Sequence, residues 1–242
     1  MSEPEAGGAL YETLLVAEER PVALERHLQR MASSARDLYG AELPPQLAAD
    51  AIAACAGVTL GRERIDVRFD ATGAAEWEAV ATPIDADQFF PPWERGAALC
   101  SVAAPQWSGA HKRADRDWLE AKEAELGETV PLLIGADGAV LEAGRANVFA
   151  VLDGALATPP LDGRILPGTA RAATLELARE LAVPAGEKRL YLEDLRTADD
   201  LFLTSSLRGI RPVRSIDGEP LGPPDPLVAR LARELRARWL EG

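Results

Sequence analysis

The chain has 242 residues, of which 47% are hydrophobic and 27% charged, so it is long enough for one large domain or two lobes and excludes a disulfide-held miniprotein. The net charge of −13 repels phosphate backbones and anionic lipids, which argues against nucleic-acid and membrane partners. The two cysteines lack the spacing of metal ligands, so we expect no metal site. The N-terminal segment is acidic and has no apolar stretch, so we expect a cytoplasmic protein.

The first third of the chain predicts two helices and a strand. Apolar residues from Leu24 to Leu38 advance by three or four positions, which indicates a helix that ends at Gly40. The expected elements are an apolar stretch over 9–16, helices over 24–38 and 45–56, a strand over 64–69 and a turn over 70–73. The proline-rich aromatic segment 88–96 is the predicted boundary between an N-terminal lobe, 1–93, and a C-terminal lobe, 94–242.

The second lobe mixes hairpins with helices. Asp-Gly pairs at 137–138 and 153–154 stand between β-prone runs and predict two hairpins. We expect strands over 97–103, 131–134, 139–142, 147–152, 155–158 and 200–204, and helices over 115–126 and 169–182. A last helix begins at Asp225 and carries a stripe for core or dimer contact at Leu227, Leu231, Leu235 and Trp239. This mixture predicts an α+β (mixed α/β) fold and not a doubly wound parallel sheet.

Lys112 is a candidate for covalent chemistry. Only three of the 26 basic residues are lysines, so a reaction that needs a deprotonatable amine has few side chains to use. Lys112 precedes an expected helix, whose dipole would disfavour a cation and lower the pKa of an amine. A solvated lysine at a helix start is the simpler alternative, and the position alone leaves both interpretations open.

Three other segments carry polar groups that suit a phosphate or a ring nitrogen. Gly168 and Thr169 begin a helix after a proline turn, where backbone N–H groups can bind a phosphate. Ser205 and Ser206 follow a strand and can donate to phosphate oxygens. Glu142 ends a hairpin strand, where an inward carboxylate would pair with a protonated ring nitrogen. Ordinary capping, a turn and a surface glutamate are the respective alternatives.

Several kinds of site have no support in the sequence. His27 and His111 have no companions at metal-ligand spacing. No Gly-rich dinucleotide motif follows a strand, no phosphate-binding P-loop is present, and no serine lies in a nucleophile elbow.

Six segments, taken in order, resemble the class IV fold of pyridoxal-phosphate enzymes, which includes branched-chain and D-amino-acid aminotransferases and 4-amino-4-deoxychorismate lyase. They are YETLLV, ERHLQRMASSA, HKRADR, LEAGRANVFAV, LATPPLDGRILPGTAR and DLFLTSSLRGIRPV. The resemblance covers about residues 11–218 and implies a two-lobed fold, pyridoxal 5'-phosphate as cofactor, a small-molecule amine substrate and a homodimer.

The resemblance also implies roles for individual residues. Lys112 matches the lysine that binds the cofactor covalently and then moves protons, and Glu142 matches the glutamate that keeps the pyridine nitrogen protonated. Arg30 matches the phosphate-binding arginine. The rest of the phosphate cup corresponds to Gly168, Thr169, Ala170, Ser205 and Ser206.

The segment after Lys112 bears on the choice of reaction. Asp115 and Arg116 resemble the K-x-x-N-R form of the lyases, with aspartate in the place of asparagine, and SSLRG resembles the NSLRG of fused lyase domains. The resemblance favours a lyase that converts 4-amino-4-deoxychorismate to 4-aminobenzoate and pyruvate. The alternative is a class IV aminotransferase that acts on branched-chain or D-amino acids.

The sequence leaves open whether the chain is catalytic and which arginine would bind a substrate carboxylate. A noncatalytic class IV fold is a third hypothesis, against which the joint presence of Lys112, Glu142 and Arg30 argues. The candidates for binding a substrate carboxylate are Arg116, Arg145 and Arg208.

Overall fold

The computed structural model describes residues 5, 7–86, 95–223 and 225–241. The chain divides into two compact units, one made of Met1–Phe89 with His111–Arg116 and the other of Phe90–Ala110 with Asp117–Glu241. Most of the predicted boundary segment, 88–96, lies outside the described residues. Residues His111–Arg116 belong to the first unit, although they follow the start of the second unit along the chain.

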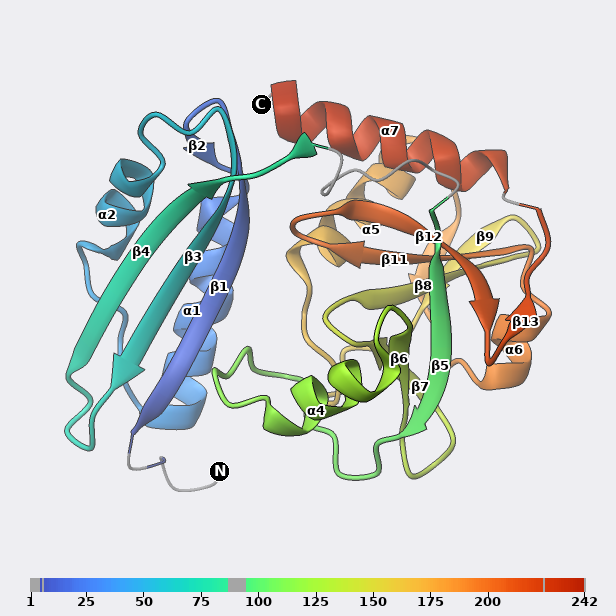
Figure 1. Ribbon diagram of the computed structural model, residues 1–242, viewed down its shortest axis with the longest axis horizontal. Helices are drawn as coiled ribbons and strands as arrows, with labels where there is room; N and C mark the ends of the chain where they lie inside the picture. The colour runs from blue at the N-terminus through green and yellow to red at the C-terminus, as the bar shows by residue number, and fades with distance from the viewer. Residues whose placement is uncertain (1–4, 6, 87–94, 224, 242) are drawn as a thin grey trace. The chain divides into compact units, whose positions relative to one another are not determined.

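The first unit contains an antiparallel sheet of order β2-β1-β3-β4 with two helices packed on one face (Figure 1). Its elements are β1 (Gly8–Ala17), β2 (Arg20–Pro21), α1 (Leu24–Tyr39), α2 (Leu47–Ala54), β3 (Leu60–Phe69) and β4 (Ala75–Pro83). Both predicted helices are confirmed, and Gly40 ends α1 in the left-handed conformation at φ 61°. The predicted strand over 64–69 is the second half of β3, and β4 was not predicted.

The register between β1 and β3 decides which side chains face the helices. Leu10 pairs with Val67 and Leu14 with Glu63, and side chains that pair across an antiparallel ladder lie on the same face. Leu10, Leu14 and Val67 pack against α1 and α2 in one buried cluster. Tyr11, which pairs with Asp66, therefore points to the opposite face of the sheet.

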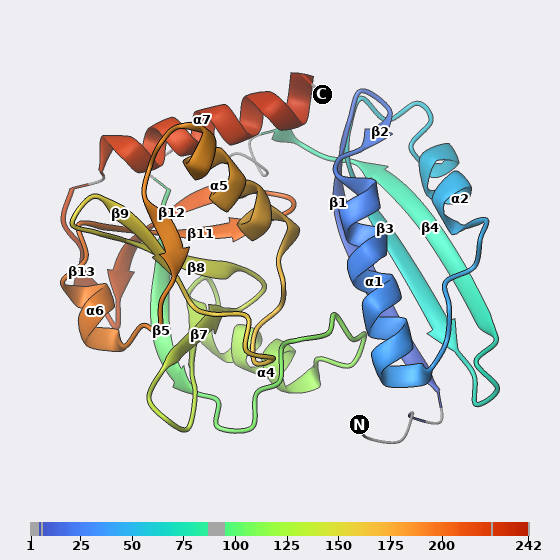
Figure 2. The same ribbon diagram turned by 180° about the vertical axis from the view of Figure 1, so that it is seen from behind.

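The second unit contains a long, curled sheet of order β10-β9-β8-β11-β12-β5-β6-β7, with β13 paired to β12 (Figure 1). The strands are β5 (Ala97–Ala103), β6 (Val130–Ile134), β7 (Val140–Ala143), β8 (Asn147–Leu152), β9 (Ala155–Thr158), β10 (Ala185–Glu187), β11 (Asp200–Ser205), β12 (Gly209–Ile216) and β13 (Glu219–Pro220). The helices are α4 (Asp117–Leu126), α5 (Thr169–Glu180), α6 (Leu192–Arg196) and α7 (Pro226–Glu241). Figure 2 shows α5 and α7 side by side, and the two helices are in contact.

The two predicted hairpins of the second unit are confirmed. β6 pairs with β7, and β8 pairs with β9 through a tight turn. Asp153 and Gly154 have φ angles of 51° and 74°, as a type I′ turn requires. β12 and the short elements β10 and α6 were not predicted.

The C-terminal helix α7 packs into the second unit. Asp225 caps it, because its Oδ1 accepts a hydrogen bond from the Leu227 N–H at 2.8 Å. The buried stripe begins at Val228, while Leu227 is only half-buried, and it continues as predicted through Leu231, Leu235 and Trp239. Among the described residues, no helix is long and apolar enough to cross a membrane.

Candidate functional site

The Lys112 segment runs along the free edge of β1 in the first unit. The Tyr11 N–H donates to the Lys112 carbonyl at 3.1 Å, and the Ala114 N–H donates to the Ala9 carbonyl at 2.9 Å. Helix α4 begins only at Asp117, later than the sequence predicted, so Lys112 does not stand at a helix N-terminus. The expected helix-dipole effect on this lysine is therefore wrong, and Lys112 is positioned by strand-like pairing instead.

Three cationic side chains lie around the ring of Tyr11. The guanidinium carbon of Arg64 lies 3.7 Å from the ring centroid, the Lys112 Nζ 4.7 Å, and the guanidinium carbon of Arg116 5.6 Å. Tyr11 itself is 4% exposed, so the ring is almost fully covered. Contacts between cations and an aromatic face are attractive and hold the charged groups in place.

Arg30 belongs to a buried ionic cluster with Glu12 and His27. Arg30 donates from Nε to Glu12 Oε1 at 2.8 Å and from Nη2 to Glu12 Oε2 at 2.6 Å. His27 Nδ1 donates to Glu12 Oε2 at 2.7 Å, since an ionised carboxylate only accepts. Burial alone would raise the pKa of Glu12, but Arg30 and His27 outweigh it and hold that pKa well below its ordinary value.

Burial favours the uncharged form of His27 in the same cluster. Burial lowers the pKa of His27, although the neighbouring Glu12 carboxylate opposes this effect. The cluster therefore consists of one carboxylate, one guanidinium and a neutral imidazole, and it fixes Arg30 between α1 and β1.

Two contacts tie the Lys112 segment to the first unit. His111 Nδ1 lies 3.0 Å from the Ser34 hydroxyl of α1. Arg113 makes a bidentate ion pair with Glu5, with both nitrogen–oxygen distances at 2.7 Å. The residues on each side of Lys112 are thus anchored independently of it.

Glu142 lies at the second candidate location, on β7 of the second unit. The side chain is buried, with Oε1 accepting from Trp107 Nε1 at 2.8 Å and Oε2 accepting from the Leu166 N–H at 3.2 Å. A Cβ on Gly109 would lie 2.3 Å from Glu142 Oε1, so a larger residue there would displace the carboxylate. The surface-glutamate alternative for Glu142 is excluded.

The helix start at Gly168 is also built by close contacts. A Cβ on Gly168 would lie 2.0 Å from Asn147 Oδ1, and Asn147 Nδ2 donates to the Leu166 carbonyl at 2.9 Å. Thr169 and Ala170 are 9% and 2% exposed, and the N-cap residue of α5, Gly168, has no side chain that could cap it. The backbone N–H groups of the first turn are therefore left to partners other than a capping side chain.

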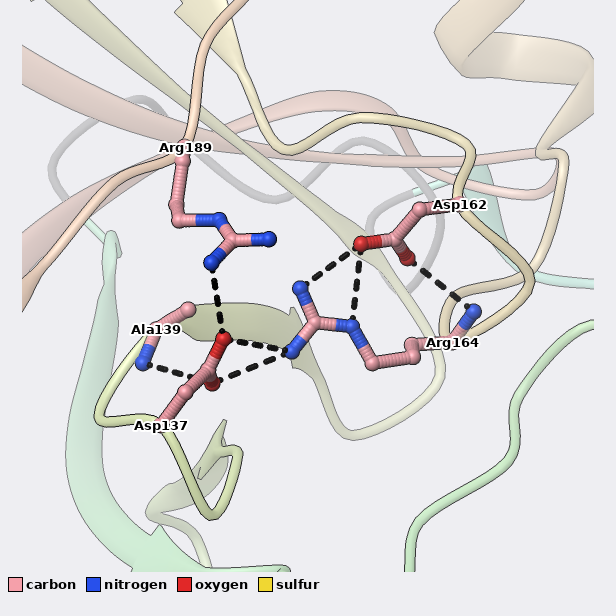
Figure 3. A network of polar contacts seen from close by, with 5 residues as sticks. All are labelled: Asp137, Ala139, Asp162, Arg164 and Arg189. Carbon is pink, nitrogen blue, oxygen red and sulfur yellow. Dashed lines mark hydrogen bonds and ion pairs between the residues drawn. The ribbon is translucent and has the colours of Figure 1, made fainter.

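The polar network in Figure 3 holds the segment that leads to this helix. Arg164 donates from Nη1 to Asp137 at 3.0 and 3.1 Å and from Nη2 to Asp162 at 2.7 Å. Arg189 reaches the same Asp137 at 3.1 Å. The Gly109 N–H also donates to the Arg164 carbonyl at 2.9 Å. One arginine thus links the β6–β7 turn to the chain that carries Leu166.

The two serines lie at the end of β11. Ser205 ends the strand, and its hydroxyl accepts from the Arg208 N–H at 3.3 Å, as the turn alternative requires. Ser206 follows in the turn before β12.

The three candidate carboxylate-binding arginines differ in their surroundings. Arg145 is half-exposed and forms ion pairs with Glu120 and Glu123. Arg208 is exposed in the turn. Arg116 lies at the Tyr11 ring. Of the three, Arg116 is the one that the structure places beside Lys112 and Tyr11.

Sequence reasoning missed Arg211. It lies on β12 opposite Leu203, and its Nε is buried without a hydrogen-bond partner in the described part of the chain. Burial lowers the pKa of Arg211, and the nearby Arg208 adds to the effect. No motif marks this residue, because its isolation depends on the strand register.

The candidate residues therefore fall into two groups. The first unit holds Lys112 and Arg30. The second unit holds Glu142, Gly168, Thr169, Ala170, Ser205 and Ser206. In both groups, polar contacts hold the chain around the candidates.

Comparisons with known proteins find one family that matches most of the chain. The sequence profile of the amino-transferase class IV family matches residues 9–216. The chain is 31% identical over 185 residues to a branched-chain-amino-acid aminotransferase from Salmonella typhimurium, covering 76% of this chain and 54% of that protein. The chain thus spans about half the length of the first curated relatives that it matches.

Solved structures can be superposed on almost the whole of this chain. The 4-amino-4-deoxychorismate lyase from Pseudomonas aeruginosa is 29% identical, with a TM-score of 0.82 and coverage of 95% of this chain and 90% of that chain. A hypothetical aminotransferase from Mycobacterium tuberculosis in its apo form is 25% identical, with a TM-score of 0.84 and coverage of 97% and 89%. The predicted resemblance and α+β fold are confirmed, and the chain belongs to the class IV aminotransferase family of pyridoxal-phosphate-dependent enzymes.

Proposed function

We propose that this chain is a pyridoxal-phosphate-dependent lyase that converts 4-amino-4-deoxychorismate to 4-aminobenzoate and pyruvate. The observation that carries the proposal is Arg116, which follows Lys112 and Asp115 and reaches the same Tyr11 ring as Lys112. A guanidinium beside the reactive amine suits an anionic substrate better than the apolar side chain of a branched-chain amino acid. The similar lyase from Pseudomonas aeruginosa supports the same choice.

The residues present fit the cofactor by the chemistry of their groups. By the family resemblance, the guanidinium of Arg30, the backbone N–H groups at the start of α5 and the Ser206 hydroxyl would hold the phosphate. Pyridoxal phosphate, when bound, supplies a carbonyl carbon for the amine of the substrate and a ring that withdraws electrons from the amine-bearing carbon. The buried carboxylate of Glu142 would hold a proton at the ring nitrogen.

The remaining steps fall to Lys112. Its amine would bind the cofactor covalently in the resting enzyme and, once the substrate displaces it, accept the proton from the amine-bearing carbon. Loss of that proton lets pyruvate leave and the ring of the product become aromatic. Pairing along β1 holds the Lys112 backbone in position for this work.

A coupled product assay tests the proposal. Cofactor-loaded protein is given enzymatically generated 4-amino-4-deoxychorismate, and pyruvate and 4-aminobenzoate are measured in parallel. We expect equal amounts of both, no product from Lys112→Ala, and wild-type rates from Lys122→Ala, a lysine that pairs with Glu125 on α4. Absence of both products from folded, loaded wild-type protein would contradict the lyase.

The second candidate is a class IV aminotransferase, which the curated relatives named branched-chain-amino-acid aminotransferase favour. It predicts amino transfer from branched-chain or D-amino acids to a keto acid, dependent on Lys112, and no release of pyruvate from aminodeoxychorismate. If the wild-type protein shows neither activity and Lys112→Ala leaves the cellular phenotype unchanged, the noncatalytic hypothesis takes over. A homodimer remains an expectation from the family, and light scattering of the purified protein measures it.

A further inference from the structure

We propose that Arg64 and Arg116, arranged around Tyr11, recognise the two carboxylates of a dianionic amine substrate. This inference rests on the proposed function in one respect, because it assumes that the neighbouring Lys112 acts on the amine of that substrate. It goes further by naming the side chains that select a dicarboxylate over a monocarboxylate or an apolar amine.

Arg64 is held so that half of its guanidinium stays available. It donates from Nε to Asp66 Oδ2 at 2.7 Å and from Nη2 to Asp66 Oδ1 at 2.6 Å. This pair uses one edge of the planar fork, and Nη1 has no hydrogen-bond partner in the described part of the chain. The opposite edge can therefore donate to a second carboxylate in the bidentate geometry that arginine favours.

The β1–β3 register explains why the Arg64 guanidinium is held rigidly. Tyr11 pairs with Asp66, and Arg64 precedes Asp66 by two positions on the same face of β3. Its guanidinium carbon lies 3.7 Å from the Tyr11 ring centroid, so the ring supports the guanidinium while Asp66 fixes its rotation. A guanidinium held in this way loses little freedom when an anion binds.

Arg116 supplies the second cation. Its guanidinium carbon lies 5.6 Å from the Tyr11 centroid, and no carboxylate pairs with it among the residues that the structure describes. Among the described residues, Asp66 is the carboxylate that pairs with Arg64, and Arg116 has no such pair, which leaves a cation beside the Tyr11 ring on a chain whose net charge is −13. A local charge of this sign attracts an anionic substrate and gains nothing from an apolar one.

A set of unreactive probes tests the subsite without turnover. Calorimetric titrations of the pyridoxal-phosphate-loaded protein use isophthalate, benzoate and benzamide, which share a benzene ring and carry two, one and no carboxylates. We expect isophthalate to bind most tightly, and Arg64→Gln and Arg116→Gln each to weaken it by about 10- to 100-fold. Arg68→Gln, an exposed arginine further along β3, is the matched control and should change nothing.

Either of two results would overturn the proposed subsite. Equal binding of isophthalate and benzoate by the wild type, or wild-type isophthalate binding by both glutamine variants, overturns the subsite. Should a glutamine variant fail to fold, the corresponding lysine variant, which keeps the charge and loses the fork, is expected to weaken isophthalate binding as well. With the natural substrate, the variants should raise KM more than they lower kcat.

The binding and product measurements distinguish a failure of the subsite from a failure of the lyase proposal. Arginine-dependent binding of isophthalate without any pyruvate release would leave the subsite standing and remove the lyase. Pyruvate release with no arginine-dependent preference for isophthalate would do the reverse.

Discussion

Glu63 gives the sharpest prediction about stability, because its carboxyl is buried inside the first unit. It lies on β3, is 0% exposed, and neither carboxyl oxygen has a hydrogen-bond partner in the described structure. Val16, Cys55 and Val58 form a buried apolar cluster in the same unit. Burial raises the pKa of Glu63 to about 7 from an ordinary value of 4.5, and raises the pKa of the Cys55 thiol to about 12 with a further contribution from Glu63.

The sign of the pH dependence follows from this raised pKa. Below pH 4.5 the carboxyl is protonated in both the folded and the unfolded chain. Between pH 4.5 and about 7 the unfolded chain loses the proton while the folded chain keeps it, so the free energy of unfolding falls as the pH rises. At about 1.36 kcal/mol per pH unit, the loss is about 3 kcal/mol and is complete above pH 7.

Glu63→Gln removes this titration and keeps the shape of the side chain. Urea denaturation followed by circular dichroism at a series of pH values gives the free energy of unfolding of both proteins. The variant should match the wild type near pH 4.5 and exceed it by about 3 kcal/mol at pH 8.5. Glu76→Gln, an exposed glutamate on β4, is the control and should show a difference that does not vary with pH. A Glu63→Gln difference that changes by less than about 1 kcal/mol across this range would refute the reasoning.

Two further predictions concern the second unit. Glu142→Gln should keep the hydrogen bond from Trp107 but cannot hold a proton at the ring nitrogen, so single-turnover kinetics should slow by about 100-fold, and an unchanged rate would mean that the ring nitrogen is paired elsewhere. Arg211→Met replaces a half-buried cation whose buried Nε has no hydrogen-bond partner among the described residues, and should raise the free energy of unfolding in urea by about 1 kcal/mol; a loss of stability would show that Arg211 has a structural partner.

The fold was predictable where the sequence carried a clear period or a specific turn. Apolar residues spaced by three or four positions before Gly40 predicted α1, and the two Asp-Gly turns predicted both hairpins of the second unit. β4 escaped prediction because it is an exposed strand at the end of its sheet, with Glu76, Trp77 and Glu78 all exposed. β12 escaped for the opposite reason, since most of it is buried and shows no alternation.

The site was predictable through motifs but not through contacts. Lys112, Arg30 and Glu142 were identified by their position in segments that resemble a family. Glu12, which pairs with Arg30, by contrast lies 18 positions away in the chain, and only the packing of α1 on β1 brings it there. Arg64 reaches Tyr11 only through the β1–β3 register, which no local pattern in the sequence determines.

The most direct test of the account is to find which lysine binds the cofactor. Borohydride reduction of the protein loaded with pyridoxal phosphate makes the bond permanent, and peptide mass mapping then locates the added mass among the three lysines of the chain. We expect the added mass on the peptide that contains Lys112 and on no other. A cofactor trapped on Lys122 or Lys188, or no trapped cofactor on folded protein, would contradict it.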